Sequence, residues 1–155
     1  MAAAAAPWVE AGPFRAHLRH VMAVGDLTAT EVATLAGVSP RMAASLLTGR
    51  GGRPVRRISP DTARSLLRVT AADARAVRTR QVPAEESRLR LRRLLVRDDP
   101  ADLADQLGVT VEAVATLASG TSGWCSALLA LRLLALARAA TVGERTADAA
   151  VRVAA

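Results

Sequence analysis

The chain has 155 residues, and its 21 basic residues against 14 acidic ones give a net charge of +7. All 21 basic residues are Arg, and aromatic residues make up only 2% of the chain. Ala, Leu and Arg favour helices, whereas the aromatic residues and Ile, which favour strands, are scarce. The composition therefore predicts an all-α protein, long enough for one ordinary domain or two small ones.

Several classes of protein are disfavoured by what the sequence lacks. Its one cysteine, Cys125, cannot form an internal disulfide, and no Cys/His cluster has the spacing of zinc ligands. The glycine-rich phosphate loops and the nucleophile elbow of hydrolases are also absent. We therefore expect no enzymatic activity, no cofactor and no metal site.

The apolar segments do not match those of membrane or secreted proteins. Residues 1–7 form an alanine-rich run without the basic residues that begin a signal peptide. The most apolar stretch, 127–140, contains Arg132 and Arg138 and is shorter than a bilayer span. We expect a cytoplasmic, nucleoid-associated protein with no membrane partner.

The predicted elements form two helical units. We expect a disordered N-terminus at 1–9, a first unit at 10–80, a second unit at 81–140 and a C-terminal tail at 141–155. The helices predicted in the first unit lie at 13–24, 28–36, 39–48, 60–69 and 71–79. Those predicted in the second unit lie at 84–97, 99–107, 110–119 and 126–140.

Cap and turn signals in the first unit predict a helix-turn-helix. Thr28 followed three residues later by Glu31 is a capping box, which starts a helix. Gly37 stands where that helix ends, because glycine adopts the left-handed conformation most readily. Ser39 caps a second helix that ends at Gly49. Two helices joined by so short a turn are typical of a helix-turn-helix.

The same signals recur 71 positions later. Residues 99–120 align without gaps with residues 28–49, and Asp99, Gly108 and Thr110 stand at the corresponding caps and turn. This internal similarity predicts two helix-turn-helix units in tandem. The identical pairs are Ala33/Ala104, Gly37/Gly108, Val38/Val109, Ala44/Ala115, Leu46/Leu117 and Gly49/Gly120.

The stretch LTATEVATLAGVSPRMAASLLTGR, residues 27–50, resembles the Xre or lambda-repressor-like helix-turn-helix family. The resemblance extends over residues 13–70, and residues 84–140 look like a more divergent copy. Similar two-unit proteins occur among regulators of high-GC bacteria and their phages. The resemblance implies that the helix at 39–48 reads the major groove of double-stranded DNA.

Charge separates the two units. Residues 13–80 hold 12 Arg and 4 acids, whereas residues 81–140 hold 7 of each. Binding to duplex DNA depends on cations that neutralise phosphates. The first unit is therefore the predicted DNA binder.

The predicted DNA contacts come from the helix at 39–48 and from the loop RGGRPVRR at 50–57. Arg41, in the first turn of that helix, has the side chain that bonds guanine bidentately. Arginines of the loop would grip the DNA backbone or enter the minor groove, although an ordinary solvated surface loop is the alternative. The residues expected at DNA are Thr28, Ser39, Pro40, Arg41, Ala44, Ser45, Thr48, Arg50, Arg53, Arg56 and Arg57.

The second unit lacks these features and is expected to serve packing or a partner. Glu112 aligns with Arg41 and would repel phosphate, and a shorter loop at 121–126 replaces the arginines. The helix at 126–140 carries more leucine than one buried stripe requires. A homodimer, another protein or burial within the chain would cover it. The residues expected at this interface are Leu128, Leu129, Leu131, Leu133 and Leu136.

These observations predict a sequence-preferring DNA-binding protein that regulates transcription. One departure from the family pattern weakens the expected specificity: Ala29 stands where many relatives carry a polar, phosphate-bonding residue. The helix at 39–48 also exposes few hydrogen-bonding side chains. A weakly specific architectural DNA-binding protein and a protein-interaction adaptor are the alternatives.

Overall fold

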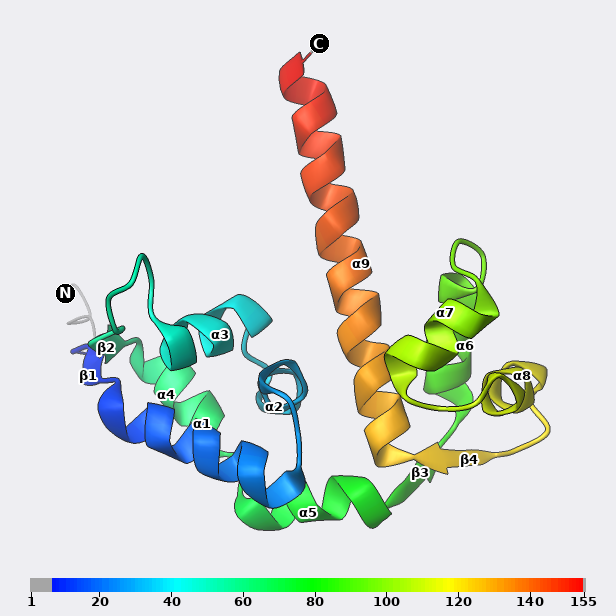
Figure 1. Ribbon diagram of the computed structural model, residues 1–155, viewed down its shortest axis with the longest axis horizontal. Coiled ribbons are helices and arrows are strands. Elements are labelled where there is room, and N and C mark those ends of the chain that lie inside the picture. Colours follow the sequence, from blue (N-terminus) through cyan, green and yellow to red (C-terminus); the bar gives the residue numbers. More distant parts are fainter. Residues whose placement is uncertain (1–6, 155) are drawn as a thin grey trace, which may run out of the picture. The chain divides into compact units, whose positions relative to one another are not determined.

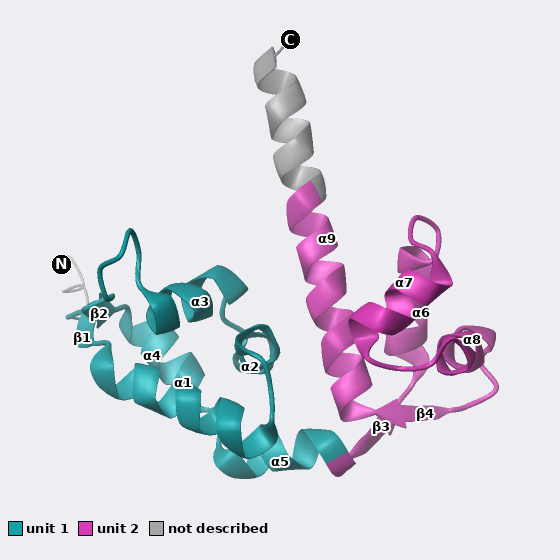
Figure 2. Cartoon of the chain, viewed as in Figure 1, with its two compact units in different colours: residues 1–78 teal, residues 79–155 magenta. Residues whose placement is uncertain are grey.

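The computed structural model describes the backbone of residues 7–154 and the side chains of residues 7–143. These residues are mainly helical, and two short antiparallel strand pairs are the only sheets among them, which confirms the predicted all-α class. The chain divides into two compact units, unit 1 at residues 1–78 and unit 2 at residues 79–155 (Figure 2).

Unit 1 packs its helices around a core of aliphatic side chains. Helix α1 packs against α2, α3 and α4, and α2 packs against α3. Large side chains buried in this core include Leu18, Val21, Leu46, Ile58 and Leu66. The elements of unit 1 are β1 (Val9–Glu10), α1 (Gly12–Gly25), α2 (Ala29–Ala36), α3 (Pro40–Thr48), β2 (Arg57–Ile58), α4 (Pro60–Leu67) and α5 (Ala71–Thr79) (Figure 1).

The predicted caps of α2 and α3 are present. The Thr28 hydroxyl accepts a hydrogen bond from the Glu31 amide at 3.2 Å, and the Glu31 carboxylate accepts one from the Thr28 amide at 2.8 Å. Gly37 ends α2 with φ of +72°. The Ser39 hydroxyl then accepts a hydrogen bond from the Met42 amide at 3.1 Å. The direction in which α3 leaves α2 is therefore fixed by short-range bonds.

A strand pair joins the segment before α1 to the segment between α3 and α4. Val9 pairs with Ile58 in the antiparallel pair β1–β2, and the Ala11 amide donates to the Arg56 carbonyl at 2.8 Å. The prediction of disorder over residues 1–9 is wrong at Val9, because strand pairing with the buried Ile58 orders it. Residues 1–6 of that predicted segment lie outside the described part of the chain.

Unit 2 has the same order of elements as the first six of unit 1. The side chains at the centre of its core include Leu91, Leu103, Leu107 and Leu133. Val82 pairs with Cys125 in the antiparallel pair β3–β4. The elements are β3 (Gln81–Pro83), α6 (Glu85–Leu94), α7 (Pro100–Leu107), α8 (Val111–Ser119), β4 (Trp124–Ser126) and α9 (Ala127–Ala154) (Figure 1).

The predicted caps of α7 and α8 are also present. The Asp99 carboxylate accepts from the Ala101 amide at 2.8 Å, and the Thr110 hydroxyl accepts from the Ala113 amide at 3.2 Å. Gly108, between the two helices, has φ of +64°. Side-chain caps and one left-handed glycine thus define the turn in each unit.

The last helix is longer than predicted. The sequence predicts an end near residue 140 and a tail at 141–155, but the backbone of α9 continues to Ala154. Thr141 and Gly143 suggest a helix end, yet the Thr141 hydroxyl donates to the Ala137 carbonyl at 2.9 Å inside the helix. Gly143 does not adopt a positive φ. Glycine lowers helix stability by about 1 kcal/mol without breaking the helix.

Candidate nucleic-acid interface

Helix α3 has one buried face and one face exposed at the surface of unit 1. Ala43 and Leu46 are buried, whereas Arg41, Ala44 and Thr48 are exposed. These exposed positions are three or four apart, so they lie along one face of the helix. Pro40 is exposed beside them, and Ser45 is half-buried.

Three hydroxyls of the predicted contact set already serve the fold. The Thr28 and Ser39 hydroxyls cap α2 and α3, and the Thr48 hydroxyl donates to the Ala44 carbonyl at 2.9 Å. Thr48 therefore has no proton left for a ligand while that bond lasts, whereas Thr28 and Ser39 use only acceptor capacity. Of the α3 residues, Arg41 has the largest polar side chain with which to contact a ligand.

Arg41 occupies a position that does not favour helix stability. It is the second residue of α3, whose first turn contains no acid. The amino end of a helix carries partial positive charge, so a cation there is unfavourable. A residue that opposes a local stability rule is a candidate for function.

The loop at 50–57, hereafter the arginine loop, begins with a tight hairpin. The Arg50 amide donates to the Arg53 carbonyl at 2.8 Å, and the Arg53 amide donates to the Arg50 carbonyl at 3.1 Å. Gly51 and Gly52 between them have φ of +56° and +73°. Two positive φ values at the centre are what a type I′ hairpin turn requires. Glycine at both positions therefore fits this turn without strain.

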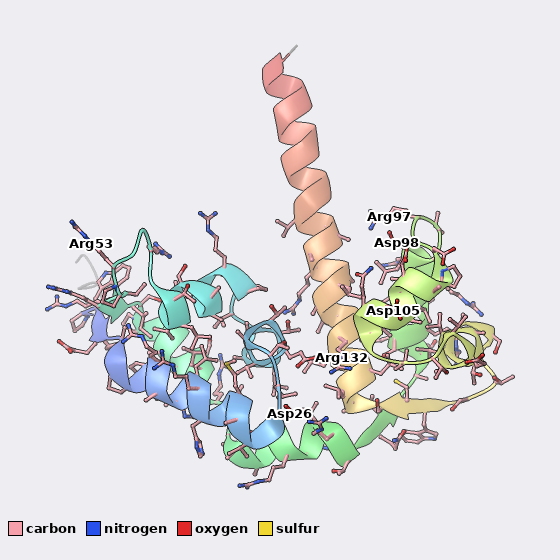
Figure 3. All side chains as sticks on the ribbon, viewed as in Figure 1. Asp26, Arg53, Arg97, Asp98, Asp105 and Arg132 are labelled. Carbon is pink, nitrogen blue, oxygen red and sulfur yellow. The ribbon has the colours of Figure 1, made fainter. Side chains whose placement is uncertain are left out.

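The hairpin brings two arginines together at the surface. Arg50 and Arg53 are directly paired across the turn, so their side chains leave the same face. Both are exposed, and Arg53 projects away from the helices of unit 1 (Figure 3). Arg56 and Arg57 follow, also exposed. All four predicted arginines of the loop are accessible to a ligand.

A cleft lies at the base of the arginine loop. Its volume is about 640 Å³, and its lining comes from Glu10, from the start of α1 and from the second arm of the loop. One carboxylate, that of Glu10, lines it together with Arg15, Arg56 and Arg57. The cleft is thus basic, with one acid at its edge.

Arg15 is a residue of this region that the sequence did not reveal. Its Nε donates to the Leu46 carbonyl and its Nη2 to the Val55 carbonyl, each at 2.7 Å. It thereby connects α1, the end of α3 and the arginine loop. Its partners are backbone carbonyls far along the chain, and no sequence spacing reports such a contact.

The corresponding surface of unit 2 has the opposite charge. Residues 27–58 contain five Arg and one acid, Glu31, whereas residues 98–126 contain five acids and no Arg. Glu112 takes the helix position that Arg41 has in α3. Its own backbone amide and the Thr110 hydroxyl bond its carboxylate and lower its pKa. The α8 surface therefore does not match a phosphate ligand.

Three leucines of the predicted partner interface contact the core of unit 2. Leu133 is fully buried, and Leu129 and Leu136 pack against the same core. The prediction is wrong for Leu133, because its own unit covers it completely, whereas Leu129 and Leu136 are covered only in part. Leu131 is buried and Leu128 half-buried, and neither is part of that core cluster.

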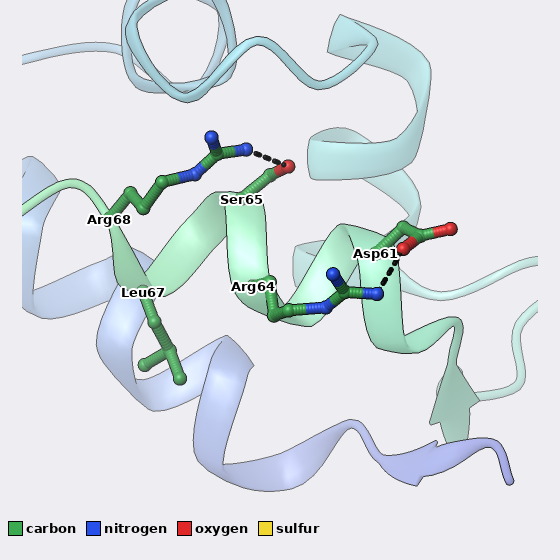
Figure 4. A pocket seen from close by; sticks show the side chains of 5 residues that line it. All are labelled: Asp61, Arg64, Ser65, Leu67 and Arg68. Carbon is green, nitrogen blue, oxygen red and sulfur yellow. Dashed lines mark hydrogen bonds and ion pairs between the residues drawn. The ribbon is translucent and has the colours of Figure 1, made fainter. Parts of the chain in front are cut away.

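Other surface features of the described residues are weaker candidates for a binding site. A cleft of about 440 Å³ on α4 contains two arginines, but Arg64 bonds Asp61 and Arg68 bonds Ser65 (Figure 4). His17 Nε2 lies 3.2 Å and 3.0 Å from the Leu66 and Val69 carbonyls, which gives it a structural role at the end of α4. No group of three or more His, Cys, Asp or Glu placed to hold a metal occurs among the residues described.

Within the described part of the chain, no helix is long and apolar enough to cross a membrane. Comparison of the chain with protein-family models, curated proteins and solved structures found no match.

Proposed function

We propose that the chain is a sequence-preferring double-stranded DNA-binding protein that regulates transcription, and that unit 1 is an Xre-like helix-turn-helix. The observation that carries this proposal is the exposed face of α3 with Arg41, followed directly by the arginine loop. The only acid between residues 27 and 58 is Glu31, which is buried in the cap of α2. Localisation at the nucleoid follows from this function.

In this proposal α3 enters the major groove and the arginine loop holds the DNA beside it. Arg41 donates two hydrogen bonds to a guanine, and the Ala44 methyl contacts a thymine methyl. Arg50 and Arg53 insert into the minor groove or contact phosphates, and Arg56 and Arg57 neutralise phosphates. Base reading is thus assigned to α3 and general affinity to the loop.

The proposal predicts a modest sequence preference. Arg41 is the only charged side chain on the exposed face of α3, and Ala44 and Ser45 are small. One bidentate pair contributes about 1–3 kcal/mol of discrimination against a wrong base. A protein that binds without any preferred site would instead be architectural.

Selection of bound duplexes from a random pool, followed by titration over a series of salt concentrations, tests the proposal. We expect an enriched site with at least one essential guanine and a linear decrease of log affinity with log salt. Arg41→Ala should remove the preference at that guanine. Arg75→Ala, which removes an exposed arginine of α5, is the matched control and should retain it.

If the pool yields no consensus while binding persists, the architectural alternative replaces the regulator. If Arg41→Ala and Arg75→Ala lower binding equally on all sequences, base reading by Arg41 is wrong. Sedimentation of the complex with a selected site would show whether one chain or a homodimer binds.

A protein-interaction adaptor is the second candidate. It is favoured by the acidic surface of α7 and α8, which include the exposed residues Asp102, Asp105 and Glu112. Val111, next to Glu112, is an exposed apolar residue. A gel-shift titration with mixed genomic fragments at low salt separates the candidates, since an absence of binding would favour the adaptor.

A further inference from the structure

Arg15 satisfies a carbonyl that the geometry of the arginine loop leaves without a partner. In a continuing helix the Leu46 carbonyl would accept a hydrogen bond from the amide of residue 50. The Arg50 amide instead donates to Arg53 within the hairpin. Arg15 Nε supplies the missing bond at 2.7 Å.

The same guanidinium holds the other arm of the loop. Arg15 Nη2 donates to the Val55 carbonyl at 2.7 Å, just beyond the hairpin and before β2. Arg15 itself is half-buried. Its planar fork therefore fixes the segments on both sides of the hairpin, at Leu46 in α3 and at Val55, to helix α1.

Unit 2 contains a comparable contact. Arg88 Nε donates to the Leu117 carbonyl at 3.3 Å, and its Nη2 donates to the Ser122 carbonyl at 2.9 Å. Leu117 stands 71 positions after Leu46. The contact thus occurs on an acidic surface as well as on a basic one, so it does not depend on the ligand chemistry of the neighbouring loop.

We propose that Arg15 is a positioning residue, which holds the arginine loop against the end of α3 so that the loop and Arg41 meet the same DNA. The consequence for DNA rests on the proposed function. The positioning of the loop does not, because it follows from the two carbonyl bonds in the free protein.

The competing role for Arg15 is a direct phosphate contact, since it lines the basic cleft with Arg56 and Arg57. Two replacements separate these roles. Arg15→Lys keeps the charge, but a single ammonium on a flexible stem does not reproduce the fork. Citrulline at position 15, introduced by chemical ligation, keeps the Nε–H and the terminal NH₂ donors and removes the charge.

DNA affinity measured against salt gives opposite results for the two roles. For a positioning residue, Arg15→Lys weakens binding roughly tenfold with an unchanged salt slope, on the scale of lost hydrogen bonds. Citrulline then changes affinity less than about threefold and also keeps the slope. Retained affinity with Lys, together with a slope about 0.9 shallower with citrulline, would overturn the proposal in favour of a phosphate contact.

A measurement without DNA separates failure of this inference from failure of the proposed function. Spin labels at positions 44 and 53, both exposed, report the distance between α3 and the hairpin in a Cys125→Ser background. We expect a narrow distribution for Arg15, a broad one for Arg15→Lys and a narrow one for the control Arg88→Lys. A distribution that stays narrow in Arg15→Lys would refute the positioning role.

Circular dichroism establishes whether Arg15→Lys folds. If it does not fold, the citrulline protein decides between the roles, because its donors preserve both carbonyl bonds. A narrow distribution with citrulline supports positioning by hydrogen bonds. A broad one refutes it, whether or not any variant binds DNA.

Discussion

Units 1 and 2 differ in surface charge while they share the contacts that shape their helices. Each has a capped pair of helices separated by a left-handed glycine, Gly37 in unit 1 and Gly108 in unit 2. Each also has an arginine that bonds the carbonyl near the end of the third helix, at Leu46 or at Leu117. We propose that the two units are copies of one motif.

Much of the charge difference between the units lies at exposed positions. Arg41 and Glu112 occupy equivalent positions in α3 and α8, and the arginine loop has no basic counterpart at 121–126. Caps and left-handed glycines act through the backbone, so exposed side chains between them are free to change. If the two units are copies, one motif presents a basic surface in unit 1 and an acidic surface in unit 2.

The largest expected effect comes from the arginine loop. Replacing its four arginines by Gln should weaken DNA binding at least a hundredfold and make the salt slope shallower by about 3.6, if each contacts a phosphate. A matched variant removes the same charge from unit 1 outside the loop, at Arg19, Arg64, Arg68 and Arg75. Equal losses in both variants would mean that net charge alone, and not its placement, drives binding.

The second expected effect concerns two glycines at equivalent positions. A Cβ at Gly49 would lie 2.3 Å from the Arg53 carbonyl oxygen, whereas one at Gly120 would meet only the Arg88 side chain, at 3.2 Å. Both glycines have positive φ. We expect Gly49→Ala to lower the free energy of unfolding by roughly 3 kcal/mol and Gly120→Ala by roughly 1–2 kcal/mol.

Urea denaturation can follow each unit separately, because Trp8 lies in unit 1 and Trp124 in unit 2. Single-tryptophan proteins, Trp8→Phe and Trp124→Phe, assign the fluorescence change to one unit. A larger loss in Gly120→Ala than in Gly49→Ala would contradict the assignment of the tight backbone contact to unit 1.

A third prediction separates function from stability at Arg41. Arg41→Glu gives α3 the acid that α8 has, so unit 1 should become more stable by about 0.3–1 kcal/mol. DNA affinity should nevertheless decrease more than tenfold, because a carboxylate would face phosphate or guanine. Urea denaturation and anisotropy titration measure the two effects, and a variant that loses both stability and binding would contradict the argument.

The smallest expected effect is the contribution of Glu112 to the pH dependence of the free energy of unfolding. Its pKa is lowered in the folded chain, so its stabilising contribution is present above the unfolded pKa and is lost as pH falls through the folded value. Glu112→Gln should therefore be less stable than the parent near neutral pH. The difference should vanish in acid, and a difference that grows as pH falls would show that the sign is wrong.

The helix boundaries near the turns followed from the sequence because the signals are local. Thr28, Ser39 and Thr110 each bond amides within three residues, and such spacings are visible in the printed sequence. The strand pairs were not predicted, because two or three residues, as in Val9–Glu10, are too few to show alternation. The end of α9 was misplaced because Gly143 stops a helix only when its φ is positive.

The candidate site was predictable in its composition but not in its geometry. The four arginines of the loop are evident from the sequence, and the hairpin that pairs Arg50 with Arg53 depends on the double glycine between them. The role of Arg15 depends on carbonyls 31 and 40 residues away. The leucines of α9 were assigned to a partner because the sequence does not show that Leu133 faces its own core.

The pairing of Arg50 with Arg53 also has a consequence for the free protein. Like charges that face each other across a hairpin repel, and unit 1 as a whole carries an excess of arginine. Added salt screens this repulsion and should raise the melting temperature of unit 1, while it should weaken the proposed attraction to DNA. Under the proposed function, folding and binding should therefore respond to ionic strength in opposite directions, and folded, DNA-free protein should be most abundant in concentrated salt.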